Sequence, residues 1–150
     1  MTETVFGIQE MNKILEDFAP KHANNLAKGV IHGLASEVVK EAKKRVPKNT
    51  GNLKKSIKAK RRRGKPGKPV SDVLVATGKA AKNDGFYWRF VEFGTGGKTA
   101  QAAQPFLTPA KNQVSANLDE VLEKQFIKKL AAAVKREQKK TAKALKWALR

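Results

Sequence analysis

The side chains that could hold a metal ion or act in catalysis are few in this chain, and their spacing favours neither role. Two histidines, His22 and His32, stand apart and do not share a helix face at the spacing of metal ligands. Nuclease and polymerase metal sites need clustered carboxylates, whereas the acids in the middle of the chain are scattered and those near position 120 fit a solvated helix face. These acids are Asp72, Asp84 and Glu92, and then Asp119, Glu120 and Glu123. The pattern therefore predicts no metal site.

The motifs of nucleophilic and phosphate-binding enzymes are also missing. The chain has no cysteine, which excludes thiol catalysis and thiolate metal sites. Two pairs, Gly78-Lys79 and Gly97-Lys98, resemble fragments of a phosphate loop, but no Gly-x-x-x-x-Gly-Lys-Ser/Thr pattern is present. We therefore expect a protein that is not an enzyme.

Positive charge is the strongest feature of the composition. The chain carries 32 Lys and Arg against 13 Asp and Glu, a formal net charge of +19. Residues 40–68 hold 14 of these bases with one acid, and residues 124–150 hold 10 with one acid. A charge run is usually a solvated face, but solubility is served better by mixed signs. We therefore expect contact with DNA or an acidic partner at Lys60, Arg61, Arg62, Arg63, Lys65 and Lys68.

A long helix precedes these bases. Apolar residues recur at helical spacing over residues 23–45, through Val38 and Ala42, and Pro47 ends the pattern. A shorter helix is expected over about residues 8–18, with Pro20 separating the two.

The bases themselves lie on a predicted hairpin. Alternation of apolar and polar residues predicts strands over residues 56–63 and 70–76. Between them, residues 64–69 are rich in Gly, Pro and Lys, which is typical of a projecting basic loop. The predicted fold class is α+β, with a long N-terminal helix packed on a small, mostly antiparallel sheet and a long C-terminal helix.

Half of all aromatic residues fall within residues 86–93. Their spacing fits both helix and strand, and we favour a short helix or turn that runs into a strand, followed by a flexible loop. Glu92 lies among aromatics and bases, which favours an ion pair with an arginine over catalysis. Gly94 is the expected position of a positive φ. The residues expected at a subunit interface or pinning the fold are Tyr87, Trp88, Phe90, Glu92, Gly94, Thr95, Pro105 and Phe106.

The last predicted helix is long and basic at its end. Thr108 and Pro109 have the form of an N-cap followed by proline at the first helical position. A helix that ran unbroken from there to Arg150 would be about 63 Å long, so its end should stand off the body. We expect a body over residues 1–125 and an extension over residues 126–150. An assembled neighbour would order the tail of this extension, residues 135–150, through Leu145, Trp147 and Leu149.

Four segments, taken in order, resemble the neck or tail-completion proteins of long-tailed bacteriophages. In that family the pattern is of the type Ala/Val-Pro-x-x-Thr-Gly-x-Leu-x-x-Ser-Ile, then Tyr-x-x-x-Val-Glu-x-Gly-Thr, then Arg-Pro-Phe-Leu-x-Pro-Ala. Here Gln104 stands where arginine is usual, and residues 61–69 and the tail after Val134 have no counterpart. The matching segments are Val46-Pro47-Lys48-Asn49-Thr50-Gly51-Asn52-Leu53 with Ser56-Ile57, Tyr87 with Val91-Glu92-Phe93-Gly94-Thr95, Gln104-Pro105-Phe106-Leu107, and Pro109-Ala110.

This resemblance implies a structural virion protein, made in the host cytoplasm, that forms a ring in the neck and joins head to tail. Six-fold symmetry is expected, with genome DNA in the lumen and with head-connector and tail-terminator proteins as neighbours. The resemblance implies neither catalysis nor a cofactor. No membrane partner is expected, because no apolar run approaches the ~20 residues of a membrane helix. The charge alone leaves an alternative open, a non-specific nucleic-acid-binding protein.

Overall fold

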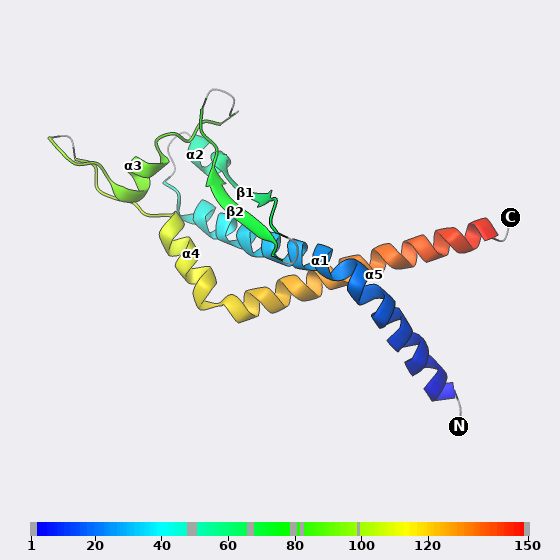
Figure 1. Ribbon diagram of the computed structural model, residues 1–150. Helices are drawn as coiled ribbons and strands as arrows, with labels where there is room; N and C mark the ends of the chain where they lie inside the picture. Colours follow the sequence, from blue (N-terminus) through cyan, green and yellow to red (C-terminus); the bar gives the residue numbers. More distant parts are fainter. Residues whose placement is uncertain are drawn as a thin grey trace.

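The computed structural model describes residues 3–47, 51–65, 68–78, 81, 83–98 and 100–148, without the side chains of residues 3–21, 144–146 and 148. It confirms the α+β class, because a long N-terminal helix packs against a small antiparallel sheet and a second long helix crosses the first (Figure 1). Residues 48–50, which belong to the first segment of the resemblance, and residues 66–67 of the predicted basic loop lie outside this description. The elements are α1 (Glu3–Arg45), α2 (Asn52–Ser56), β1 (Ile57–Arg62), β2 (Val70–Val75), α3 (Trp88–Phe93), α4 (Leu107–Ala116) and α5 (Leu118–Ala148).

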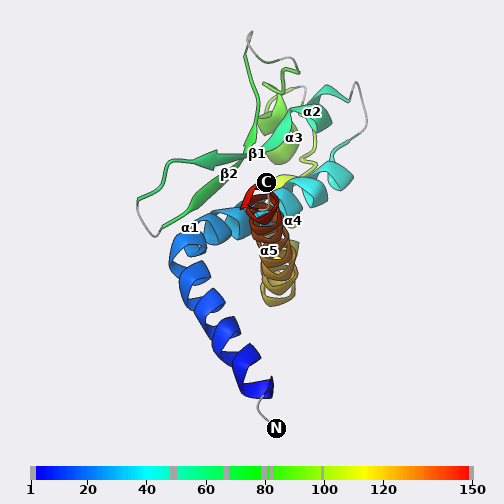
Figure 2. The ribbon, with the colours of Figure 1, turned by 90° about the vertical axis from the view of Figure 1, so that its right-hand side faces the viewer.

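Helix α1 is continuous, so the prediction of two helices separated by Pro20 is wrong. A proline inside a helix cannot donate to the carbonyl four residues earlier and its ring crowds that carbonyl, which bends the helix without always ending it. Figures 1 and 2 show α1 changing direction within its blue N-terminal half. The helix predicted over residues 23–45 is confirmed, and it ends at Arg45, two residues before Pro47.

Strands β1 and β2 form the predicted hairpin. They pair antiparallel, in a register that runs from Ile57 opposite Val75 to Arg62 opposite Val70. Ile57 is fully buried, and Ala59, Val73 and Val75 pack partly buried against the core. Figure 2 shows the hairpin running alongside α1 toward the bend of that helix. The hairpin therefore buries one face on α1 and leaves its basic residues in solvent.

The apolar row predicted for α1 is buried only in part, at Val30, Ala35 and Ala42. Val39, Ala42 and Val46 are buried, whereas Val38 and Leu34 are only half-buried. A row at strict four-residue spacing drifts by about 40° per step around a helix with 3.6 residues per turn, so it cannot face one partner for long. The rest of the core comes from other elements: Leu53, Ile57, Phe106 and Ala110.

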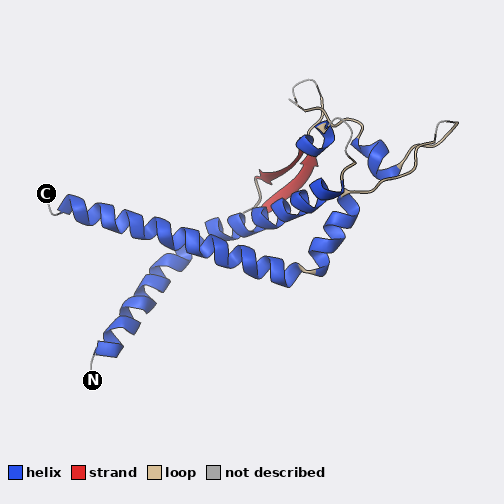
Figure 3. Ribbon diagram, turned by 180° about the vertical axis from the view of Figure 1, so that it is seen from behind, coloured by secondary structure: helices blue, strands red, loops and turns tan. Residues whose placement is uncertain are grey.

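Two predictions in the second half of the chain are corrected. The predicted strand is absent from the described residues after α3, since residues 94–96 and 100–105 have no regular structure. The last helix is broken at Asn117, whose backbone N–H and side-chain amide both donate to the carbonyl of Gln113. Asparagine is a poor helix former because its side chain competes for such backbone groups. The break lets α5 turn back across α1 (Figure 3).

Two glycines one helical turn apart lie at the crossing of α1 and α5, and the close approach is at Gly33. A Cβ on Gly33 would collide with the buried side chain of Gln125, whose Nε2 donates to Glu37 Oε1 at 3.2 Å. A Cβ on Gly29 would make ordinary contact with Lys129 at 3.5 Å. Beyond the crossing the two helices diverge as separate arms (Figures 1 and 3).

Candidate functional site

Glu92 joins α3 to the start of α4. Its side chain is buried, with 3% of the residue exposed. Oε2 accepts the backbone N–H groups of Phe106 and Leu107 at 2.8 and 2.9 Å, and Oε1 accepts that of Thr108 at 2.8 Å. The first amides of a helix lack partners within the helix, and a carboxylate there also matches the positive end of the helix dipole. Glu92 therefore caps α4 from a separate element.

This arrangement replaces two sequence predictions. Among the described residues Glu92 pairs with backbone amides and not with an arginine, and Thr108 lies inside α4 and is not its N-cap. Burial raises the pKa of Glu92, but the hydrogen bonds from Leu107, Phe106 and Thr108 outweigh it and hold the pKa below its usual range. Glu92 is therefore a structural anion, charged at neutral pH.

Gly94 lets the chain leave α3 sharply. Its φ of 76° confirms the predicted positive value, and with a ψ of 179° it lies in a region that is open essentially only to glycine. A Cβ there would lie 2.8 Å from the carbonyl oxygen of Gln101 and 3.0 Å from the amide nitrogen of Ala103. The loop closes on itself, because Thr95 N–H donates to Gln101 O, and Gln101 N–H donates to Thr95 Oγ1.

The remaining residues of this predicted site divide into two groups. Phe106 is a fully buried part of the core, and Tyr87 and Trp88 pack half-buried against it. Pro105 is exposed. The phenylalanines of this region face solvent, with 65% of Phe86, 53% of Phe90 and 70% of Phe93 exposed. We name these three residues the aromatic face.

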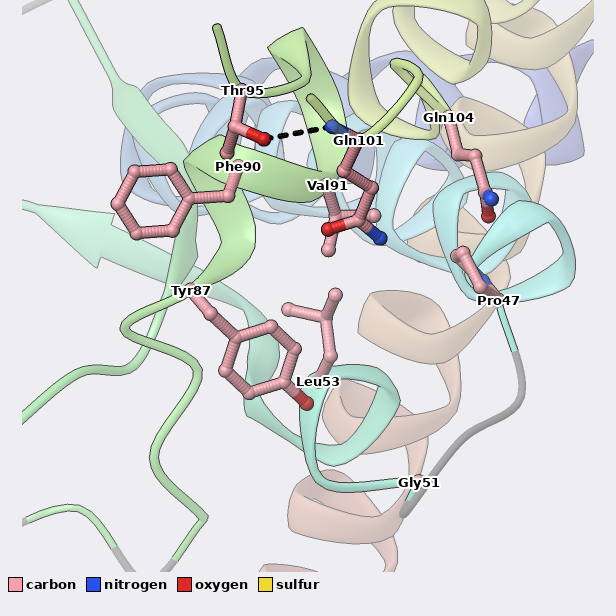
Figure 4. Close-up of a pocket in the computed structure, with 9 residues that line it drawn as sticks. All are labelled: Pro47, Gly51, Leu53, Tyr87, Phe90, Val91, Thr95, Gln101 and Gln104. Atoms are coloured by element: carbon pink, nitrogen blue, oxygen red, sulfur yellow. Dashed lines mark hydrogen bonds between the residues drawn. The ribbon is translucent and has the colours of Figure 1, made fainter. Parts of the chain in front are cut away.

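A hollow of about 400 Å³ lies beside the aromatic face. Figure 4 shows Leu53, Val91 and Gln101 projecting toward its centre, while the ring of Phe90 points away from it. Pro47, Tyr87 and Gln104 complete much of its wall. The hollow is mainly apolar and carries no ionisable cluster. Its shape and chemistry suit an apolar side chain of another protein better than a reaction.

The bases of the hairpin are exposed, as a contact surface requires. All six predicted contact residues, from Lys60 to Lys68, have exposed side chains. Arg62 Nε contacts Asp72 Oδ2 at 2.6 Å across the hairpin. Beneath them, His32 Nδ1 lies 3.0 Å from Ser71 Oγ. Burial lowers the pKa of His32, and the charges of Arg61 and Lys129 lower it further.

Comparison with protein families identifies the chain. A family model described as "Bacteriophage HK97-gp10, putative tail-component" matches residues 9–94, more than half of the chain. The chain belongs to this HK97-gp10-like family. No curated protein and no solved structure gives a significant match. The match takes in most of α1, the hairpin and α3, and it ends at Gly94.

Membership of the HK97-gp10-like family makes the chain a bacteriophage tail component and places it in the virion. This membership confirms the resemblance found in the sequence, as far as the assignment to phage tail components. Two of the four segments of that resemblance, from Val46 and from Tyr87, fall within the matched residues almost completely. The segments around Phe106 and Ala110 lie beyond them, so the structure adds that Glu92 ties these segments to the matched part.

The predicted tail anchors of this HK97-gp10-like chain can be described only in part. Trp147 is exposed, with 75% of its surface in solvent. The side chain of Leu145 and the whole of Leu149 lie outside the described residues.

No group of three or more metal-ligating side chains lies close enough to hold an ion in the part of the chain that is described. Likewise, none of the described helices is both long and apolar enough to cross a membrane.

Proposed function

We propose that this tail component is a structural subunit of a closed ring in the neck, which joins the head connector to the tail tube around the DNA path. Family membership supports the tail assignment. The proposal goes beyond that assignment in three respects: the closed ring, its expected six-fold symmetry, and the connector and terminator proteins as its neighbours. In this role the subunit holds other proteins in place and needs neither catalysis nor a cofactor.

The observation that best supports ring formation is the aromatic face beside the apolar hollow. Large exposed aromatic side chains are enriched where proteins meet, because their burial removes much apolar surface from water. A subunit that carries both a protruding apolar face and a hollow can contact the next copy head to tail. Such contacts generate a ring when the rotation closes. Phe86 and Phe93 are the proposed protrusion, and the hollow lined by Leu53 and Val91 is the proposed receptor.

Phage complementation tests this proposal. A phage that lacks the gene is supplied with the variant Phe86→Ser/Phe93→Ser, and joined particles are counted by electron microscopy. The variant should fold, because these side chains are exposed, but free heads and free tails should accumulate. The matched control is Val70→Ser/Ile127→Ser, two exposed apolar residues outside the aromatic face. Normal particles with the aromatic variant would contradict the proposed interface.

We also propose that residues 1–125 form the body of the ring subunit, that residues 126–150 form a basic helical extension, and that a neighbour orders the tail of this extension, residues 135–150. The described contacts of α5 with α1 include Gln125 and Lys129, and they reach to Glu137, which lies 3.5 Å from His22. A chain that ends at Lys135 keeps the crossing and should keep its melting temperature, while it joins heads to tails poorly. Loss of folding on truncation would place the extension in the subunit's own core.

The nucleic-acid-binding alternative makes a different prediction for the same particles. A free DNA-binding protein needs no contact between copies, so its function would survive loss of the aromatic face. The family assignment favours the structural role, and the exposed bases supply the ring with a surface for DNA.

A further inference from the structure

Bases from three elements that are distant in the sequence line two hollows on one side of α1. One hollow, of about 450 Å³, lies between α1, Arg61 of β1 and the bases of α5. The other, of about 440 Å³, lies between α1 and the loop of the hairpin. Lys28 borders both hollows, so they adjoin along α1. We name this surface the basic groove, and its bases are Lys28, Arg61, Arg62, Arg63, Lys65, Lys68, Lys129, Arg136 and Lys140.

Few carboxylates balance these nine bases among the described residues. Glu137 Oε1 lies 2.7 Å from Lys140 Nζ and 3.5 Å from His22 Nε2. Asp72 contacts Arg62. The depressed pKa of His32, next to Arg61 and Lys129, is consistent with a local excess of positive charge. Nothing in the fold requires these charges to be gathered here, since their mutual repulsion opposes the crossing of α5 over α1.

From these observations we infer that the basic groove binds the phosphate backbone of duplex DNA without sequence preference. This inference rests on the proposed function for the identity of the polyanion, since the neck surrounds the exiting genome. Guanidinium and ammonium groups on several elements suit a ligand with regularly spaced phosphates, and such contacts carry no sequence information.

An acidic protein fits the groove less well. Protein interfaces draw most of their affinity from buried apolar anchors. None of the large exposed hydrophobic residues among the described part of the chain lines either hollow. In addition, residues 124–148 of α5 carry nine bases and one acid along about 37 Å, which extends the positive surface beyond the groove. A long, highly charged and uniform partner matches this surface.

The test measures binding of the isolated full chain to a 30-bp duplex by fluorescence anisotropy over a series of salt concentrations (about 50–200 mM). The groove variant is Arg61→Gln/Lys129→Gln/Arg136→Gln. Its control, Lys54→Gln/Lys55→Gln/Lys111→Gln, removes the same charge from exposed positions outside the groove. We expect the groove variant to bind about tenfold more weakly or worse, with a salt slope reduced by about 3, and the control to change little.

Three further measurements can confirm or overturn the inference that the basic groove binds DNA. A charge-conserving variant, Arg61→Lys/Lys129→Arg/Arg136→Lys, should bind nearly as well as the wild type. DNA should raise the pKa of His32, followed by NMR, because phosphates offset the charges of Arg61 and Lys129. An equal loss of affinity in the control variant, or tighter binding of poly-glutamate than of DNA, would overturn the inference. The ring proposal would survive either result, because particle assembly tests it separately.

Discussion

At the α3–α4 junction one buried carboxylate receives three backbone amides, whereas the nine bases of the basic groove, eight of them exposed, are contacted by two carboxylates among the described residues. The first arrangement satisfies its charge within the chain, so its contacts contribute to folding. The second leaves its charge unsatisfied and contributes little to folding. Substitutions at the junction should therefore lower stability, and substitutions in the groove should lower binding while stability stays the same.

The largest expected effect is at Glu92. Glu92→Ala removes the acceptor of three amides at a buried position and should lower the free energy of unfolding by about 3 kcal/mol or more. Urea denaturation measures this loss. Glu41→Gln is the control, since Glu41 is only partly buried and its ion pairs with Lys44 and Arg45 lie within one helix, where such pairs contribute much less. Equal losses in the two variants would remove the distinction between the junction and the surface.

Gly94 offers the next test of the junction. Gly94→Val forces a side chain into a glycine-only conformation and against Gln101, and should cost about 2 kcal/mol. Gly96→Val in the same loop meets no atom within 4 Å and has no positive φ, so it should be nearly neutral. Thermal unfolding of the pair measures the difference. Similar melting temperatures would make residues 94–104 an ordinary surface loop.

The charge of Glu92 predicts a pH dependence of stability. Its pKa is lower in the folded chain than the value of about 4.3 for an unfolded glutamate. Its contribution is therefore complete above that unfolded value and is lost as the pH falls through the folded pKa. The stability gap between the wild type and Glu92→Gln, measured by urea denaturation, should narrow as the solution is acidified below about pH 4. A gap that stays constant with pH would show that the charge contributes nothing.

The two glycines of the helix crossing should respond differently to the same change. Gly33→Ala pushes Gln125 away and should cost about 1 kcal/mol or more. Gly29→Ala adds a methyl group at ordinary contact distance and should be neutral or stabilising, because alanine favours helix. Calorimetry of both variants measures the effect. If Gly33→Ala is as stable as Gly29→Ala, the crossing is not closely packed at Gln125.

The smallest effect on stability is expected in the hairpin. Neutralising Arg61, Arg62, Arg63, Lys65 and Lys68 to Gln should shift the free energy of unfolding by no more than about 0.5 kcal/mol, since all are exposed. Urea denaturation, with DNA binding measured on the same sample, separates folding from function. A severe loss of stability would place these bases in the fold and outside the functional surface.

The hairpin and the helix over residues 23–45 could be predicted because their signals are local. Alternating apolar residues on either side of a Gly- and Pro-rich loop specify both the strands and their pairing. The cap of α4 could not be predicted, because Glu92 accepts hydrogen bonds from amides that lie 14–16 residues away. Every residue except proline has a backbone N–H group, so the sequence does not show which of these groups a carboxylate will contact. The arginine expected for Glu92 came from its basic neighbours, and the fold supplies amides in its place.

Longer-range features were missed for related reasons. Lys129, Arg136 and Lys140 join Lys28 and the hairpin bases only because α5 crosses α1. A signal for that crossing existed in the spacing of Gly29 and Gly33, which leaves one face of α1 open to close approach. Asn117 in an otherwise helical pattern was a weak signal for the break that makes the crossing possible.

Electron cryomicroscopy of the virion whose genome encodes this chain tests the central proposal most directly. The proposal predicts a closed ring of this subunit between head and tail, with the aromatic face between copies and the basic groove turned toward the DNA path. A position elsewhere in the virion, or copies that do not contact one another, would contradict it.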